Sequence, residues 1–297
     1  MKGINTILFL VMSIIYSLFT DGKIMVFYFK GCIYLKRLLS WKKMILDIRT
    51  LSISNNLETN RKNDASLRKC AMLYDFSTII SEGIREKLDF PKEKSSILPL
   101  GADQISTVNH DFSSGLKLIY VGTLYGRDIH KTISGLKKFI DIYPNIPITY
   151  DIIGDAVDPD IILNLKKITK ELNLNNIVTF HGRIPNSELT PFFDNCNIGV
   201  SFVPITPYYD HQPVTKSFEY IMSGLYTIAT ATYCNKEIIT NVNGVLIEDN
   251  EEDFCKALED IYLNKDNINC EKIRQSLIEY RWENIIINKL KPIIEQI

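Results

Sequence analysis

Residues 116–126, LKLIYVGTLYG, decide the fold of the second half of the chain. The first six residues form an apolar run of strand length, which is typical of a parallel strand covered on both faces. Gly122 follows directly, and a glycine at the carboxyl end of such a strand lets a ligand approach the backbone, while the next helix start favours anions. The G-x-x-x-G spacing of Gly122 and Gly126 matches neither the dinucleotide fingerprint nor the Walker loop, which argues against an ordinary NAD or P-loop site.

Short β-branched or aromatic runs of the same kind alternate with longer amphipathic segments along most of the chain. The candidate strands are residues 24–29, 44–48, 77–80, 96–99, 116–121, 148–153, 177–181, 198–202, 226–230 and 244–247. This alternation predicts an α/β protein with two doubly wound, Rossmann-like domains. The polar stretch near residues 101–111 is the best boundary between them.

Composition supports a globular protein of this size. The 297 residues are enough for two domains, and 45% are hydrophobic and 23% charged. With 34 basic and 35 acidic side chains the net charge is −1, so the chain has no global attraction to nucleic acid. The six cysteines form no CxxC pair and the four histidines are dispersed, which indicates reduced thiols of a cytosolic protein and no metal site.

The apolar stretch of residues 4–20 has three interpretations. It is near the lower length limit of a membrane-spanning helix, and Lys2 before it gives a faint likeness to a signal peptide. No small-residue cleavage site follows, and the chain around it has the α/β pattern. We therefore interpret it as a helix in the interior of the first domain.

Three glycine turns are expected at one edge of the second sheet. Besides Gly122 with Arg127, Gly154 ends the run at 148–153, and Gly182 with Arg183 ends the run at 177–181. The carboxyl ends of parallel strands meet at the same edge, where open α/β sheets bind ligands. The convergence of the three turns predicts a binding site more strongly than any one of them.

The segment after residue 202 supplies groups that suit a nucleoside diphosphate. Pro213 favours a helix start, which leaves free backbone N–H groups near residues 212–215, other than that of Pro213 itself, directed at the same edge. Lys216 and Glu219 are three residues apart and share one face of this helix. A lysine could bind phosphate and a carboxylate could bind ribose hydroxyls, but an exposed surface ion pair has the same spacing.

The run PVTKSFEYIMSGLYTIAT at residues 213–230 resembles the nucleotide-sugar-binding helix and following strand of family 4 retaining glycosyltransferases. These enzymes have the GT-B architecture of two Rossmann-like domains. Segments that resemble the family occur in order at residues 45–49, 74–83, 97–103, 118–122, 243–247 and 280–282. The resemblance implies a shortened acceptor-side domain at residues 1–108, a donor domain at 109–277 and a helix at 278–297 that crosses back to the first domain.

The resemblance also implies roles for individual residues. Glu219 would hold the ribose hydroxyls, and Arg127, with Lys131 as a second choice, would neutralise the diphosphate. In the family's pattern, Glu219 matches the second of two donor-binding glutamates, and the first comes eight residues earlier. This chain has His211 at that position, and the adjacent Asp210 could supply the carboxylate. Gly182, Arg183 and Ile184 match the turn that frames the nucleobase.

The patterns and the resemblance together define the candidate site, with no metal and no other cofactor. Catalysis is assigned to Glu219, Arg127, Lys216, Asp210 and His211, and donor binding to Gly122, Thr123, Gly126, Lys131, Gly154, Gly182, Arg183, Ile184, Gln212, Val214 and Thr215.

The expected function is transfer of a sugar, with retention, from a nucleoside-diphosphate sugar to a glycan or lipid-linked acceptor in surface polysaccharide or lipopolysaccharide biosynthesis. A cytoplasmic enzyme peripheral to the inner face of the cell membrane fits this function. The basic segment 23–43 could dock on an anionic membrane surface, or it could be an ordinary solvated face. His211 and the short first domain favour an alternative, a non-catalytic paralogue that binds donor or a partner without turnover. A sugar-nucleotide epimerase is a third interpretation.

Overall fold

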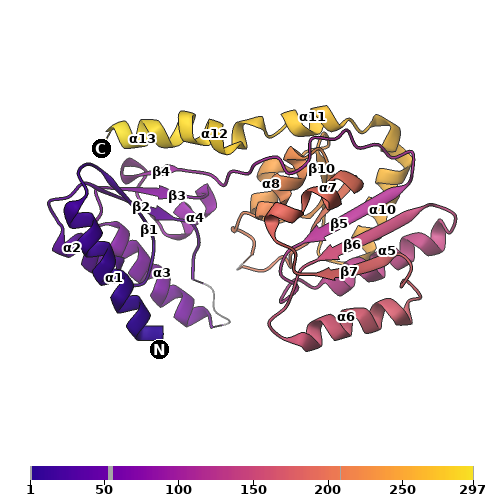
Figure 1. Ribbon diagram of the computed structural model, residues 1–297, viewed down its shortest axis with the longest axis horizontal. Coiled ribbons are helices and arrows are strands. Elements are labelled where there is room, and N and C mark those ends of the chain that lie inside the picture. Colours follow the sequence, from indigo (N-terminus) through magenta and orange to yellow (C-terminus); the bar gives the residue numbers. More distant parts are fainter. Residues whose placement is uncertain (1, 53–55, 208, 297) are drawn as a thin grey trace. The chain divides into compact units, whose positions relative to one another are not determined.

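The computed structural model describes residues 2–52, 56–207 and 209–296 (Figure 1). The chain forms two compact units, one of residues 1–100 with 283–297 and one of residues 101–282. The boundary expected at residue 108 lies eight residues beyond this division. Residues 101–108 belong to the second unit, where the backbone N–H groups of Ile105 and Ser106 donate to the Ser223 hydroxyl at 3.0 and 3.3 Å.

The first unit contains a four-stranded parallel sheet. Its strands are β1 (Ile24–Phe27), β2 (Met44–Ile48), β3 (Phe76–Ile79) and β4 (Ser95–Ile97), in the order β1-β2-β3-β4. The helices before and between them are α1 (Lys2–Phe19), α2 (Cys32–Leu38), α3 (Leu57–Ala71), α4 (Glu82–Lys87) and the short η1 (Lys92–Lys94). The chain ends in α12 (Trp282–Ile285), the π-helical η5 (Ile286–Leu290) and α13 (Lys291–Gln296).

Residues 4–19 lie in a helix, α1, as the sequence predicts, but the expectation that this helix is interior is wrong. Of α1, Leu10 and Ile14 pack against the core of the first unit, and Ser17 is buried. Most of the other apolar side chains that the structure describes on α1 are exposed. None of the helices in the described part of the chain is both long and apolar enough to cross a membrane.

The second unit contains a six-stranded parallel sheet in the order β10-β9-β8-β5-β6-β7. Its strands are β5 (Leu116–Val121), β6 (Ile148–Ile153), β7 (Val178–Gly182), β8 (Ile198–Ser201), β9 (Tyr226–Thr230) and β10 (Gly244–Ile247). Its helices are α5 (Ile129–Ile142), α6 (Pro159–Glu171), α7 (Thr190–Asn195), α8 (Thr215–Met222), α9 (Tyr233–Ile238), α10 (Glu251–Asn264) and α11 (Cys270–Gln275), with short helices η2 (Asn186–Glu188), η3 (Lys265–Asn267) and η4 (Ile278–Tyr280).

Helices cover both faces of the second sheet, because β5 sends alternate side chains to opposite sides. Leu118 and Tyr120 belong to the cluster with Phe139 of α5 and Phe254 of α10. Ile119 and Val121 belong instead to the cluster that contains Phe193 of α7 and Tyr220 of α8. The prediction of two Rossmann-like α/β units, each with a parallel sheet, is confirmed.

The order of the strands reverses direction at β5. From β5 the chain proceeds through β6 to β7 on one side, and then crosses to β8, β9 and β10 on the other. The β5–β6 ladder runs the full length of both strands, whereas β5 pairs with β8 only at Leu118–Ile198 and Ile119–Gly199. In open α/β sheets such a reversal leaves a crevice at the carboxyl ends of the strands.

Candidate functional site

The three predicted glycine turns lie side by side at this edge. The Gly122 N–H donates to Ile153 O at 3.0 Å, and the Gly154 N–H donates to Gly182 O at 2.8 Å. A Cβ at Gly154 would lie 1.9 Å from Gly122 O, so only glycine allows the two turns to come this close. The bare backbone of β5, β6 and β7 is thus exposed at one place.

Two buried phenols hold the end of β5 in position. The hydroxyl of Tyr120 donates to Thr123 O at 2.6 Å, and the hydroxyl of Tyr220 accepts the Val121 N–H at 2.8 Å. Burial raises the pKa of both hydroxyls, so they remain neutral at physiological pH. Their hydrogen bonds fix the end of β5 and the glycine turn that follows it.

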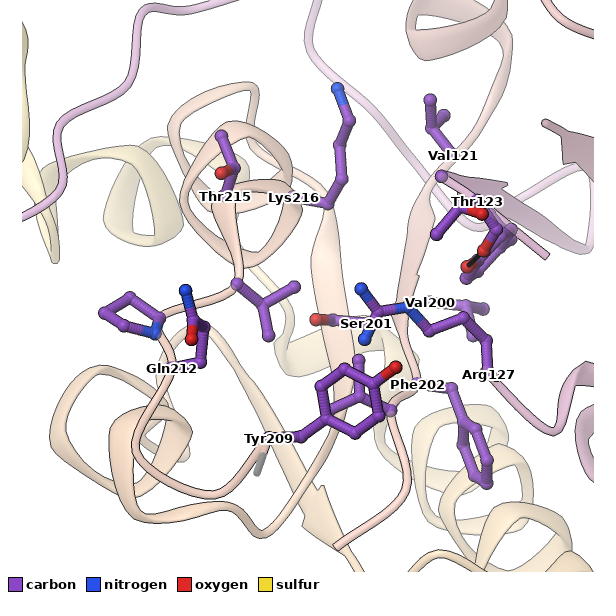
Figure 2. A pocket seen from close by; sticks show the side chains of 15 residues that line it. Val121, Thr123, Arg127, Val200, Ser201, Phe202, Tyr209, Gln212, Thr215 and Lys216 are labelled. Carbon is purple, nitrogen blue, oxygen red and sulfur yellow. Dashed lines mark hydrogen bonds between the residues drawn. The ribbon is translucent and has the colours of Figure 1, made fainter. Parts of the chain in front are cut away.

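A cavity of about 360 Å³ lies between the β5 turn, the end of β8 and the start of α8 (Figure 2). Its lining consists of Tyr120, Val121, Gly122, Thr123, Arg127, Val200, Ser201, Phe202, Val203, Tyr209, Gln212, Pro213, Val214, Thr215 and Lys216. The cavity thus collects seven of the predicted site residues from two segments that are about 90 residues apart. Its two lining cations come from different strand–helix connections, Arg127 after β5 and Lys216 from α8.

The guanidinium of Arg127 lies over the ring of Tyr209, with Cζ 4.4 Å from the ring centre (Figure 2). The same phenol is close to the β5 turn, because a Cβ at Gly126 would lie 3.2 Å from its hydroxyl oxygen. Gly126 itself has a φ of 65°, which glycine adopts without strain. The loop after β8 therefore contributes the aromatic face that holds Arg127 in the cavity wall.

The start of α8 presents backbone N–H groups to the cavity. Val214 precedes the helix and has no side-chain group that could cap it. The first-turn N–H groups of a helix have no intrahelical partner, and they carry a partial positive charge that attracts anions. Gln212, Val214 and Thr215 line the cavity at this point, as the sequence predicts for the start of the helix.

Lys216 and Glu219 form an ion pair along α8, with 21% and 13% of their side chains exposed. Lys216 Nζ also lies 3.5 Å from the side-chain oxygen Oδ1 of Asn186. Glu219 is not in the lining of the cavity and reaches it through its contact with Lys216. The pair is half-buried, so it differs from the fully exposed surface pair that was the alternative interpretation of the spacing.

A second cavity of about 360 Å³ adjoins the first. Val121, Gly122 and Thr123 line both cavities, and the second extends over the ends of β6 and β7. Its other lining residues are Ile153, Gly154, Asp155, Ala156, Val157, Arg183 and Ile184. The glycine turn of β5 therefore separates the first cavity, which is lined by Arg127 and Lys216, from the second cavity beside the β7 turn.

Several predicted site residues have other partners and do not line either cavity. Asp210 accepts the Tyr233 N–H at 2.7 Å with Oδ1, and its Oδ2 lies 3.3 Å from His211 Nε2. The His211 ring stacks on Tyr233 with the ring centres 4.6 Å apart. Lys131 pairs with Asp128 at 3.1 Å. Gly126 and Gly182 contribute turns with positive φ but no lining surface.

Sequence reasoning missed the contribution of β8 and the loop that follows it. Ser201, Phe202 and Tyr209 line the first cavity, and none of them was predicted. Ser201 and Phe202 end a strand that the sequence does predict, so the rule that ligands bind at the carboxyl ends of strands could have found them. Tyr209 lies in an irregular loop whose path depends on tertiary contacts, and its sequence carries no signal for the stacking on Arg127.

Residues 109–281 match the sequence profile of the glycosyl transferases group 1 family. The chain belongs to this family, and its two parallel α/β units are those of a GT-B glycosyltransferase. Among curated protein sequences, none matches the chain significantly. No cluster of three or more His, Cys, Asp or Glu side chains in the described ranges could hold a metal ion.

Solved structures share the fold at low sequence identity. A sucrose-phosphate synthase of Thermosynechococcus elongatus is 16% identical with a TM-score of 0.70, over 93% of this chain and 73% of that one. HepE of Anabaena, solved with UDP and glucose, is 13% identical with a TM-score of 0.75, over 97% and 81%. The lipopolysaccharide outer core galactosyltransferase WaaB is 16% identical with a TM-score of 0.66, over 92% and 75%.

Proposed function

We propose that the protein binds a nucleoside-diphosphate sugar in the two adjoining cavities of its second unit and transfers the sugar, with retention, to a glycan or lipid-linked acceptor. The observation that carries this proposal is the meeting of Arg127, Lys216 and the start of α8 around one cavity, directly beside the bare glycine turn of β5. Each of these groups attracts negative charge, and together they suit a diphosphate.

The dimensions and chemistry of the two cavities support a donor of this kind. Each measures about 360 Å³, within the range of small-molecule sites. The cationic cavity would hold the diphosphate and sugar. The cavity with Arg183 and Ile184 would hold the nucleobase, and Glu219, beside Lys216, would accept hydrogen bonds from the ribose hydroxyls.

The proposed chemistry needs electrostatic stabilisation more than a protein nucleophile. As the sugar leaves, an oxocarbenium-like transition state forms and negative charge builds on the departing diphosphate. The guanidinium of Arg127, the ammonium of Lys216 and the N-terminus of α8, which border the cavity, would stabilise that charge. The acceptor hydroxyl would attack from the same face of the sugar that the leaving group departs from, which retains the configuration. We propose no metal and no other cofactor.

The family membership and two of the similar structures support the donor class and the biological context. HepE was solved with UDP, and WaaB is named for a step in the lipopolysaccharide outer core. We propose a UDP-sugar as the first donor to test, and a surface polysaccharide or lipopolysaccharide as the final product. A cytoplasmic location fits both.

Titration calorimetry with UDP, GDP and ADP and their sugars tests the donor, and NMR of the product's anomeric proton tests retention. Arg127→Ala and Lys216→Ala should each weaken donor binding at least tenfold, whereas Lys167→Ala, at an exposed cation of α6, should not change it. Binding without hydrolysis or transfer would favour the non-catalytic alternative. No binding of any nucleotide would overturn both.

A further inference from the structure

The outer face of α1 is apolar from Ile7 to Phe19. Leu10 and Ile14 face the core of the first unit. The exposed large apolar side chains of this helix are Ile7, Leu8, Phe9, Val11, Met12, Ile15, Tyr16, Leu18 and Phe19, with 43% to 84% of their surfaces accessible. Leu8, Met12, Ile15 and Phe19 follow the helical period and form one stripe on this face.

Such a face differs from that of an ordinary surface helix, which places polar residues opposite its buried side. Residues 4–20 carry no charged side chain. Exposed apolar patches of this extent on a protein mark sites that meet another apolar surface. Because α1 packs lengthwise against the first unit through Leu10 and Ile14, only its outer face is available for such a contact.

Next to α1, the neighbouring helix α2 adds aromatic and basic groups (Figure 1). Tyr34, Leu38 and Trp41 are exposed, with 56%, 57% and 67% of their surfaces accessible. Arg37 lies among them and is exposed, as is Lys30 just before the helix. Aromatic rings beside basic side chains are typical of the zone where a bilayer meets water.

Not every cation of the basic segment 23–43 is available to a partner. Lys36 is buried and donates to Asp75 at 2.7 Å. Lys42 donates to Thr20 O at 2.7 Å, at the end of α1. Lys30, Arg37 and Lys43 remain exposed, although Lys43 also forms a long ion pair with Asp75 at 3.9 Å. The structure thus divides the basic segment into cations that hold the fold and cations that face outward.

We propose that the outer face of α1, with Tyr34, Leu38 and Trp41 of the α2 region, docks in the plane of an anionic membrane. We call this set of residues the docking surface. Its apolar stripe enters the boundary between headgroups and acyl chains, while Lys30, Arg37 and Lys43 contact anionic headgroups. This inference goes beyond the proposed function, because it concerns the first unit and needs no donor.

Charge favours a membrane over a second copy of this chain as the partner. Residues 2–46 contain seven basic side chains and one acidic one, Asp21. A symmetric dimer through α1 would bring two such regions against each other, and like charges in a low-dielectric interface repel. An anionic lipid surface supplies the opposite charge and an apolar interior together.

Co-sedimentation of the full chain with vesicles tests the proposal. Binding is expected to vesicles of phosphatidylcholine with 30 mol% phosphatidylglycerol, and to be at least tenfold weaker with phosphatidylcholine alone. The variant Leu8→Gln/Met12→Gln/Ile15→Gln/Phe19→Gln should lose this binding at least tenfold. Its matched control, Ile142→Gln/Leu163→Gln/Val242→Gln/Leu263→Gln, changes four exposed apolar residues of the second unit and should bind as the parent does.

Two further measurements separate the membrane from other partners. Lys30→Gln/Arg37→Gln should weaken vesicle binding roughly fivefold for each cation removed. With Trp282→Phe, Trp41 is the only tryptophan, and its emission should shift to shorter wavelength on vesicles and be quenched by brominated lipid. The proposal is overturned if the parent does not bind anionic vesicles, or if light scattering shows a dimer that the α1 variant dissociates. Donor binding by the second unit should be the same in all these variants, so this test stands apart from that of the proposed function.

Discussion

The guanidinium of Arg127 and the ring of Tyr209 are stacked, with Cζ 4.4 Å from the ring centre, although 82 residues separate them. The aromatic face attracts the cation and restricts its rotation. Arg127 is therefore held in the cavity wall before any anion arrives. Its side chain then loses less conformational entropy when the anion binds. The Tyr209 hydroxyl also lies next to Gly126, so this one side chain contacts both Arg127 and the turn that follows β5.

Removing the ring of Tyr209 should weaken donor binding. We expect Tyr209→Ala to raise the donor Kd about threefold to tenfold, which corresponds to about 1 kcal/mol of cation–π and ordering energy. Tyr209→Phe keeps the ring and should bind within about twofold of the parent. Titration calorimetry with UDP measures both. Equal losses in the two variants would show that the hydroxyl, and not the stacking, is what matters.

Arg127→Ala and Glu219→Ala should each abolish sugar transfer. Loss of one group that stabilises the transition state typically lowers kcat about 100-fold to 1,000-fold. Both side chains are only partly buried, so thermal melting should change by only a few degrees. Glu171→Ala, at an exposed end of α6, is the matched control and should transfer normally. Full turnover in either test variant would refute the assigned role.

Gly154→Ala should weaken donor binding as well as lower the stability of the second unit. The new methyl would be 1.9 Å from Gly122 O, so the β5 and β6 turns must separate, at a cost of about 1–3 kcal/mol. Gly135→Ala is a matched comparison in the same unit, because its methyl would lie 2.6 Å from Glu251 O, far from both cavities. Both variants should melt at lower temperature in calorimetry. Only Gly154→Ala should weaken UDP binding, and an equal Kd in the two folded proteins would contradict this.

The ion pair between Lys36 and Asp75 should make the first unit sensitive to acid. Burial raises the pKa of Asp75, but hydrogen bonds from Lys36 and from the Met44 N–H outweigh it and hold that pKa below its usual value. A depressed carboxyl pKa stabilises the fold above the unfolded value, about 3.9, and this stabilisation is lost as the pH falls through the folded pKa.

Asp75→Asn should therefore lower the free energy of unfolding by about 3 kcal/mol at pH 7, because the buried Lys36 loses its counter-charge. The difference from the parent should shrink below about pH 4. Urea unfolding followed by circular dichroism at several pH values measures both effects. Glu58→Gln removes the exposed partner of Lys62 and should change the free energy by less than about 0.5 kcal/mol. A constant difference between Asp75→Asn and the parent across this pH range would contradict the explanation.

Strand periodicity was enough to predict most of the architecture. Predominantly apolar runs such as residues 116–121 and 148–153 fall on β5 and β6 with the same bounds. The β5 run is buried on both faces except at the half-buried Lys117, and in β6 all residues but Thr149 and Asp151 are buried, so the local pattern and the tertiary environment largely agree. The glycines after these runs could be placed at one edge, because parallel strands end together.

The exposure of residues 4–20 could not be predicted in the same way. Periodicity identifies an apolar helix, but a helix that is apolar on all sides fits a protein interior and a contact surface equally well. Likewise, nothing in the spacing of Asp210 and His211 shows that the Tyr233 N–H and the Tyr233 ring engage them. Such partners come from a segment more than 20 residues away and depend on the fold.

The short ladder between β5 and β8 divides the second sheet into two halves. Arg127 belongs to the half built from β5, β6 and β7, and Lys216 belongs to the half built from β8, β9 and β10. Only two residue pairs join β5 to β8, so the boundary between the halves has few main-chain bonds with which to resist opening. The separation of Arg127 and Lys216 is therefore set across the boundary between the two halves, and a change in how the halves pack would change the charge that a bound diphosphate experiences.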